Sequence, residues 1–245
     1  MSIPVVLSHW RDFRRIVLFT GAGLSAESGV PTYRGTGGIW REYNYQDYAC
    51  QRAFDRDPVQ VLDFHELRRA KVLSCAPHAG HAHIRAMQAV HSGTHVITQN
   101  IDGLLQRAGV AVAAELHGSL WRLRCPRHGI REDLAAGAFA HRQCPDCPPA
   151  RAPWLRPDIT WFEDAVNEAV FEHAAMLVDD AELFVGIGTS GAVWPAAGFA
   201  ERARRRGARM VEINPEDNEA SALYPERLRI SASEGLPTLF PIPVE

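Results

Sequence analysis

The 245-residue sequence has no apolar run that approaches the roughly 20 residues needed to span a membrane, so no membrane partner is expected. Its first residues lack the basic start and long apolar core of a signal peptide, and we expect a cytoplasmic protein. The formal net charge of −3 is too small to predict general binding to nucleic acids or membrane surfaces. The five cysteines, three of them clustered, argue against a disulfide framework and for a metal site.

The most informative stretch begins with a short apolar run. Residues 16–19 include two β-branched side chains and predict a strand that is buried on both faces. The letters GAGLSA at 21–26 then fit the G-x-G-x-x-G/A turn that joins strand to helix in dinucleotide-binding units. Gly21 would allow the tight turn, Gly23 would let the backbone approach the phosphates, and Ala26 would let the helix pack on the strand. A glycine turn without a ligand is the alternative.

Apolar runs that predict strands alternate with segments of helical spacing along most of the chain. Expected strands lie at 16–19, 94–98, 181–187 and 208–213. A short lead-in helix is expected within 1–15, residues 39–75 are mostly helical in pattern with a helix start at Asp57 and Pro58, and further helices are expected at 77–90, 167–179 and 195–206. This alternation predicts an α/β fold: a Rossmann-like, doubly wound parallel sheet with a smaller zinc-binding and helical domain. The expected boundaries are 1–38, 76–120 and 155–245 for the dinucleotide-binding domain, with 39–75 and 121–154 forming the small domain.

Polar side chains directly follow the expected strand at 94–98. Gln99, Asn100 and Asp102 stand where ligands bind in doubly wound folds, just past the carboxyl end of a parallel strand. An Asx turn that caps the following short helix explains the same residues without a ligand. A second glycine turn, at 188–191, follows the strand at 181–187.

Four potential metal ligands occur as two close pairs. Cys125 and His128 form C-x2-H, and Cys144 and Cys147 form C-x2-C, with 15 residues (129–143) between the pairs. This spacing is typical of a closed tetrahedral zinc site, and four protein ligands leave no open position, so the zinc would be structural. His141, three residues before Cys144, is an alternative fourth ligand, and absence of the metal is a further alternative.

These motifs together resemble the sirtuin family. The signature-like letters GAGLSAESGVPTYRG occupy 21–35, with Tyr33 where the family more often has Phe. TQNIDGL at 98–104 and ELHGSL at 115–120 resemble two further family motifs, and the resemblance runs from about residue 16 to 237 with at least six motifs in family order. The family usually supplies four zinc-binding cysteines, so His128 is a departure.

The resemblance implies an NAD-dependent protein-lysine deacylase, with NAD as a consumed co-substrate and structural zinc. His117 would be the general base, a task suited to a side chain that titrates near neutrality, and Asn100 the second catalytic residue. Asn100, Ile101 and Asp102 would line the nicotinamide pocket. The other residues implied to bind NAD are Gly21, Ala22, Gly23, Ala26, Glu27, Tyr33, Arg34, Trp40, Gln99, Gly188, Thr189, Ser190, Asn214, Pro215, Glu216 and Ala232. The implied partners are acylated lysine side chains of proteins, with no specific nucleic acid, and we expect a monomer.

Within the family, Ala26 and Glu27 resemble the branch that removes succinyl and malonyl groups. That branch uses a Tyr-x-x-Arg pair on a helix and a small alanine; here Arg68 matches the arginine, Ala49 the alanine, and His65 replaces the tyrosine. Residues 65 and 68 share one helix face, although such pairs are more often solvated surface residues. We therefore expect Arg68 to pair with an acidic acyl group, and His65, when protonated, to add a second charge and pH dependence.

The letters LRPDITWFED at 155–164 resemble the family segment that pairs with the acyl-peptide backbone. Glu163 replaces the usual glycine, and Asp164 replaces the usual glutamate. Ile230–Pro237 resembles the family loop whose alanine, here Ala232, lies against the adenine.

An NAD(H)-binding oxidoreductase or redox sensor is the alternative function. The sequence offers no further catalytic set for hydride transfer, and C-x2-C beside C-x2-H favours a metal site over a redox dithiol. A zinc-stabilised nucleic-acid-binding module is a third interpretation, which the slight net acidity disfavours.

Overall fold

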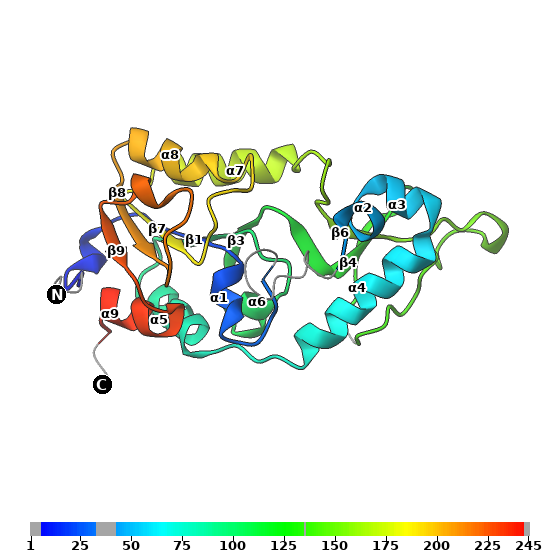
Figure 1. The fold of residues 1–245 in the computed structure, drawn as a ribbon, viewed down its shortest axis with the longest axis horizontal. Coiled ribbons are helices and arrows are strands. Elements are labelled where there is room, and N and C mark those ends of the chain that lie inside the picture. The colour runs from blue at the N-terminus through cyan, green and yellow to red at the C-terminus, as the bar shows by residue number, and fades with distance from the viewer. Residues whose placement is uncertain (1–5, 33–42, 135, 243–245) are drawn as a thin grey trace.

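The computed structural model describes residues 6–32, 43–134 and 136–242 (Figure 1). Its larger sheet has six parallel strands in the order β3-β2-β1-β7-β8-β9. The strands are β1 (Ile16–Thr20), β2 (Thr94–Thr98), β3 (Val112–Glu115), β7 (Leu183–Ile187), β8 (Arg209–Ile213) and β9 (Glu226–Leu228). Counted along the chain this order is 3-2-1-4-5-6, the order of a Rossmann sheet, which confirms the expected fold class.

Helices cover both faces of this sheet. In Figure 1, α7 (Glu168–Asp179) and α8 (Gly198–Arg205) lie along one face, and α5 (Ala79–Val90) and α9 (Ala232–Leu239) lie on the other. A hydrophobic core lies on each face of the sheet, and the side chains of β1 alternate between the two cores. Ile16 and Leu18 pack with α5 and α9, whereas Val17 and Phe19 pack with α7 and α8. All five residues of β1 are buried, as its continuous apolar run predicts.

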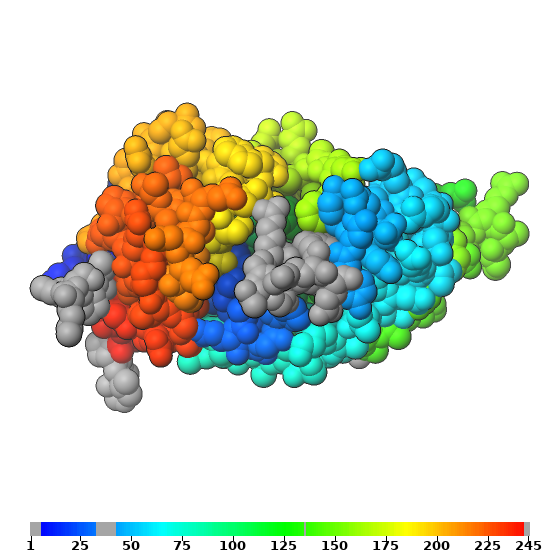
Figure 2. All heavy atoms as spheres, viewed as in Figure 1, coloured from blue at the N-terminus to red at the C-terminus, as the bar shows by residue number. Residues whose placement is uncertain are grey.

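A smaller domain lies beside the larger sheet. It combines three helices, α2 (Tyr45–Tyr48), α3 (Gln51–Arg56) and α4 (Pro58–Leu73), with an antiparallel sheet in the order β5-β4-β6. The strands of that sheet are β4 (Gly118–Cys125), β5 (Gly129–Glu132) and β6 (Arg156–Ile159). Helix α4 begins where the sequence predicts, because the Asp57 side chain accepts a hydrogen bond from the Gln60 N–H and Pro58 occupies the first turn. Figure 2 shows these helices in cyan opposite β8, β9 and α9 in orange and red.

Three expectations about the fold change in detail. The small sheet takes in β6 and the start of β4, which the expected boundaries assign to the dinucleotide-binding domain. The segment from Ala232 onward is helix α9 rather than part of a loop, and Pro237 is tolerated inside it. Of the lead-in helix expected within 1–15, the described residues 6–15 contain a 3-10 turn at Trp10–Asp12.

The remaining short elements are α1 (Ala22–Ala26), α6 (Leu104–Arg107) and the 3-10 turns Pro149–Arg151 and Ser221–Leu223. Within the described ranges, no helix has both the length and the apolar character that crossing a membrane requires.

Candidate active site and metal centre

Two glycine turns meet at the point where the strand order of the large sheet reverses. The Gly21 N–H donates to Ile187 O and the Gly23 N–H to Gly188 O, both at 2.9 Å. A Cβ atom on Gly21 would lie 2.7 Å from Gly188 O, and one on Gly23 would lie 2.7 Å from Gly188 Cα. Glycine is therefore required at both positions so that the turns after β1 and β7 can touch. Dinucleotides bind at this crevice in doubly wound folds.

The packing role expected for Ala26 is not seen, and Gly23 has a packing role beside the one expected for it. The Cβ direction of Gly23 faces the backbone of Gly188, so this glycine allows two turns to pack closely rather than only clearing space for phosphates. Ala26 is exposed at the end of α1, and Leu24 and Ser25 are the buried residues of that helix. The close packing that the fingerprint predicts is thus carried by the glycines, not by Ala26.

A buried polar network follows β2. The Asn100 amide nitrogen donates to Gly21 O at 3.0 Å and to the Ser25 hydroxyl at 3.2 Å, and that hydroxyl donates to Asp102 Oδ2 at 2.8 Å. The other oxygen of Asp102 accepts from the Leu104 N–H, which is the helix-capping turn that the alternative interpretation expected. Asp102 can cap the helix and belong to the network at the same time, because each interaction uses a different carboxylate oxygen. Burial raises the pKa of Asp102, opposed by its hydrogen bonds and by the charge of Arg68.

Ser25 is a site residue to which the sequence analysis assigned no role. It is 1% exposed and links Asn100 to Asp102. The signal for it was its place within the GAGLSA turn, one helical turn after Gly21.

His117 lies between β3 and β4, next to this network. Its Nδ1 is 3.0 Å from Gln99 O, and a carbonyl oxygen can only accept, so Nδ1 carries the proton and Nε2 keeps its lone pair. Burial lowers the pKa of His117 from its ordinary value, with the Gln99 hydrogen bond acting in the opposite direction. The ring is therefore neutral at pH 7, and Nε2 can accept a proton, as a general base must.

The further turns whose residues are expected to bind NAD are tied to one another. Asn214, after β8, donates from its side chain to Thr189 O at 2.9 Å. The Glu27 carboxylate accepts from the Ser233 N–H at 3.1 Å and so holds the start of α9, where Ala232 is buried. Burial alone would raise the pKa of Glu27, but hydrogen bonds from Ser231 and Ser233 outweigh that effect. The pKa is therefore lowered from its ordinary value, and the carboxylate is ionised. Three expected contact residues are exposed on these turns: Ser190, Pro215 and Glu216.

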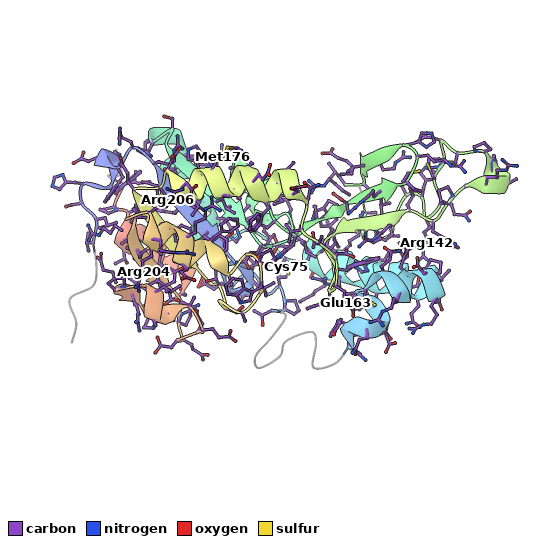
Figure 3. All side chains as sticks on the ribbon, turned by 90° about the horizontal axis from the view of Figure 1, so that it is seen from above. Cys75, Arg142, Glu163, Met176, Arg204 and Arg206 are labelled. Carbon is purple, nitrogen blue, oxygen red and sulfur yellow. The ribbon has the colours of Figure 1, made fainter. Side chains whose placement is uncertain are left out.

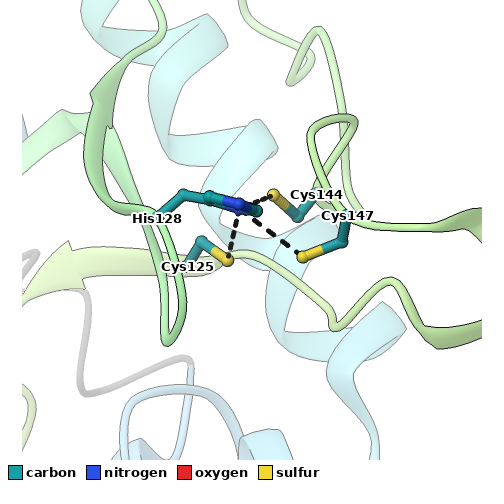
Figure 4. A group of neighbouring side chains, drawn as sticks. All are labelled: Cys125, His128, Cys144 and Cys147. Carbon is teal, nitrogen blue, oxygen red and sulfur yellow. Dashed lines mark hydrogen bonds between the residues drawn. The ribbon is translucent and has the colours of Figure 1, made fainter.

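The four potential metal ligands converge in the small domain (Figure 4). Their ligand atoms all lie within 4.8 Å of one another. His128 Nδ1 is 3.7 Å from Cys125 Sγ, 3.4 Å from Cys144 Sγ and 3.5 Å from Cys147 Sγ. Tetrahedral zinc with ordinary bond lengths would place nitrogen and sulfur about 3.6 Å apart, so the donor set fits this metal. His141 is exposed and is not part of the group, which favours His128 as the fourth ligand.

His65 cannot contribute a charge in the way the sequence analysis expected. It is 1% exposed, its Nδ1 is 2.8 Å from Val61 O, and its Nε2 accepts from the Trp161 indole N–H at 3.2 Å. Both ring nitrogens are thus occupied within the protein. Burial, with a smaller effect of Arg68, lowers the pKa of His65 to about 3. The expected pH dependence from a protonated His65 is therefore wrong, because the ring is neutral at all physiological pH values.

Of the other two expected acyl-site residues, Arg68 acts electrostatically on Asp102 of the nicotinamide motif, and Ala49 is buried in the small domain. Arg68 is half-buried, its guanidinium lies 5.9 Å from the Phe64 ring centroid, and its charge lowers the pKa of Asp102. Ala49 is 5% exposed, and its carbonyl accepts from the Phe162 N–H at 3.1 Å. Tyr33, Arg34 and Trp40 lie outside the described residues.

The fold and the site define a dinucleotide-binding α/β protein with a histidine whose Nε2 can accept a proton, and with a Cys3His cluster whose geometry suits a metal ion. The Sir2 family model matches residues 21–195, and the chain belongs to this family, the sirtuins.

Known relatives are similar to this chain over nearly its whole length. The chain is 38% identical to NAD-dependent protein deacylase 2 of Pyrobaculum aerophilum, covering 92% of this chain and 90% of the relative. It is also 38% identical to an NAD-dependent protein deacylase of Vibrio cholerae, covering 98% and 94%. Among solved structures, a Sir2 homologue in complex with NAD superposes with a TM-score of 0.83 at 32% identity, covering 94% of this chain and 93% of the other.

Proposed function

We propose that this protein is an NAD-dependent protein-lysine deacylase that releases nicotinamide and O-acyl-ADP-ribose. The observation that carries the proposal is that His117, held through Nδ1 by Gln99 O, has Nε2 without a hydrogen-bond partner among the described residues, while Asn100, Ser25 and Asp102 form a buried network directly after Gln99 in the fold. The relatives from Pyrobaculum aerophilum and Vibrio cholerae bear the name of this activity.

Each group of the site has a distinct task. When bound, NAD supplies an electrophilic ribose carbon from which nicotinamide departs. His117 accepts a proton at Nε2, and the Gln99 carbonyl fixes the tautomer that makes this possible. Asn100 is held by Gly21 and Ser25, so its amide has one orientation, and Asp102 is buried beside it. Such preorganised polar groups cost no reorganisation during the reaction.

The Cys3His group would hold a structural zinc. Three buried cysteines and His128 supply all four ligands, and they connect β4 to the chain before β6. In this role the metal would stabilise the small domain, because metal binding by residues far apart in sequence is coupled to folding.

We propose further that acidic acyl groups on lysine are preferred over acetyl. The support is Arg68: it lies on α4, close enough to Asp102 to lower its pKa, and a planar guanidinium can hold a carboxylate in a bidentate pair. Ala49 leaves room because its side chain is a single methyl group. His65 is not part of this proposal, since both of its ring nitrogens are occupied.

The deciding experiment measures nicotinamide release from NAD with succinyl-, malonyl- and acetyl-lysine versions of one peptide. The wild-type protein should release nicotinamide in the presence of these peptides, with a higher kcat/KM for succinyl- and malonyl-lysine than for acetyl-lysine. Arg68→Met should lose that preference while retaining acetyl-lysine turnover, because only the charged pair is removed. If NADH forms and nicotinamide does not, the oxidoreductase alternative is correct; if acetyl equals succinyl in the wild type, the protein is an ordinary deacetylase.

A further inference from the structure

The turn Trp161–Asp164 contains an unusual backbone conformation. The Asp164 N–H donates to Trp161 O at 3.2 Å, which closes the turn, and its third residue, Glu163, has φ of 74°. Across the residues that the structure describes, Glu163 is the only one other than glycine with positive φ. Glycine is favoured at this place in a turn, because a Cβ atom makes the left-handed conformation unfavourable. The chain therefore keeps a glutamate where glycine would fit better.

The Glu163 side chain is not needed to hold this turn. The Phe162 N–H donates to Ala49 O at 3.1 Å, and Asp164 pairs with Arg156 while accepting from the Trp161 N–H at 3.0 Å. These contacts would hold a glycine at position 163 equally well.

The carboxylate of Glu163 instead reaches Arg52 on α3, at 2.6 Å. The two side chains are 48% and 75% exposed, respectively. An exposed ion pair of this kind stabilises a protein only weakly, so it does not account for a strained acidic residue at a glycine position. Strain that is retained without a structural reason points to function.

The turn lies at the edge of the candidate active site. The Thr160 N–H donates to His117 O at 3.0 Å, three residues before Glu163. Three residues span at most about 11 Å of chain, so the Glu163 backbone lies within reach of residues that flank a lysine whose side chain enters the site. β6 is an edge strand of the small sheet, and its chain continues into this turn. Figure 3 shows Glu163 beside the helices of the small domain, on the side toward the larger domain.

We propose that Glu163 is a specificity-determining residue that selects protein substrates by charge: it favours a basic residue next to the acyl-lysine and disfavours an acidic one. The inference rests on the proposed deacylase function and concerns the peptide rather than the acyl group. Arg52 competes with a basic substrate residue for the same carboxylate, and its high exposure allows it to move aside. Removing Arg52 should therefore strengthen the selection, whereas removing the carboxylate should abolish it.

The test compares kcat/KM for nicotinamide release on acyl-lysine peptides that carry Arg, Ala or Glu at the positions directly before and after the acyl-lysine. The wild type should prefer Arg over Glu by roughly three- to fivefold at low salt, which is the scale of one exposed charge pair, and the ratio should shrink as ionic strength rises. Glu163→Gly should bring the ratio close to one, and Arg52→Ala should raise it above the wild-type ratio.

Thermal unfolding separates this role from a structural one. Glu163→Gly should have a melting temperature equal to or above that of the wild type, because glycine suits the backbone at this position. Glu163→Gln keeps the strain and the side-chain size but removes the charge, and it should also lose the preference. Unchanged Arg-over-Glu ratios in Glu163→Gly and Glu163→Gln, or no ratio in the wild type, would overturn the proposal. Absence of nicotinamide release from every peptide would instead overturn the proposed deacylase function.

Discussion

Substituting methionine for either of two adjacent arginines on α4 should have different effects, one on stability and the other on substrate preference. Arg69 is completely buried, pairs with Asp133 at 2.7 Å, and lies over the rings of Trp121 and Phe139 at 4.8 and 4.5 Å. Its guanidinium also donates to four backbone carbonyls: Leu120, Asp133, Ala136 and Gly137. Arg68 is half-buried and belongs to the candidate acyl site. We expect Arg69→Met to destabilise the protein and Arg68→Met to alter acyl preference.

The magnitude follows from what Arg69→Met leaves behind. Methionine replaces most of the apolar stem but leaves a carboxylate that is nearly buried, and four carbonyls, without their charged donor. Removing one partner of a buried ion pair costs about 3–5 kcal/mol. For a protein of this size, each kcal/mol lowers the melting temperature by roughly 2–4 °C, so a loss of about 6–20 °C is expected. Arg68→Met should cost about 1 kcal/mol or less.

Guanidinium chloride unfolding followed by tryptophan fluorescence measures the difference, because Trp121 contacts the Arg69 guanidinium directly. The same samples are assayed for nicotinamide release with succinyl- and acetyl-lysine peptides. Arg69→Met should unfold at lower denaturant and keep its ratio of acyl preference in the fraction that remains folded. If Arg69→Met is as stable as Arg68→Met, the buried network does not hold the small domain together, and the reasoning is refuted.

Three further outcomes are expected. His117→Ala should fold normally and lose about 10²–10⁴-fold in deacylation, so near-normal turnover would show that another group is the base. The purified protein should contain one zinc by elemental analysis, and His128→Ala should release it more readily than His141→Ala; equal retention would argue against His128 as a ligand. The pKa of His65 is lowered to about 3, so between about pH 6.5 and 3 this side chain binds a proton only in the unfolded state. The stability that its neutral ring contributes should be fully present above pH 6.5 and should be lost as the pH falls toward 3. Urea unfolding at pH 7 and pH 5 should show a larger loss for the wild type than for His65→Gln, and equal losses would contradict the buried neutral ring.

The sequence predicted the parts of the fold that depend on local patterns. The apolar run of β1, the cap at Asp57 and the paired metal ligands were each placed correctly, because strand burial, helix capping and ligand spacing are short-range properties. The pairing of β6 with β4 was not predicted, since it joins residues that are more than 30 positions apart with the metal module between them. Helix α9 was expected to be a loop because its first residues resemble a loop of the family, and a resemblance of letters does not define where a helix begins.

The positions on α4 show a different limit. Val61, His65, Arg69 and Val72 follow one another at helical spacing and are all buried, so His65 and Arg69 belong to the core-facing stripe of the helix. Family resemblance assigned His65 to the substrate because its neighbour three residues on, Arg68, matches a known pair. In the structure His65 instead lies with Val61, one helical turn earlier, and both of its ring nitrogens bond within the protein. The spacing of residues 65 and 68 was therefore correct for a helix but did not show which face is buried.

The metal module and the candidate base are mechanically joined through one strand. β4 begins at Gly118, directly after His117, and ends at Cys125, one of the proposed zinc ligands. Gly118 has φ of 77°, and a Cβ atom there would lie 2.0 Å from Asp158 O in β6, so no other residue fits this junction without displacing the two strands. The position of His117 is therefore fixed on one side by Gln99 and on the other by a strand whose far end is held by the metal ligands. Loss of zinc should reach the chemistry through this strand, as a loss of order at His117, because all four coordination positions would be occupied by the protein.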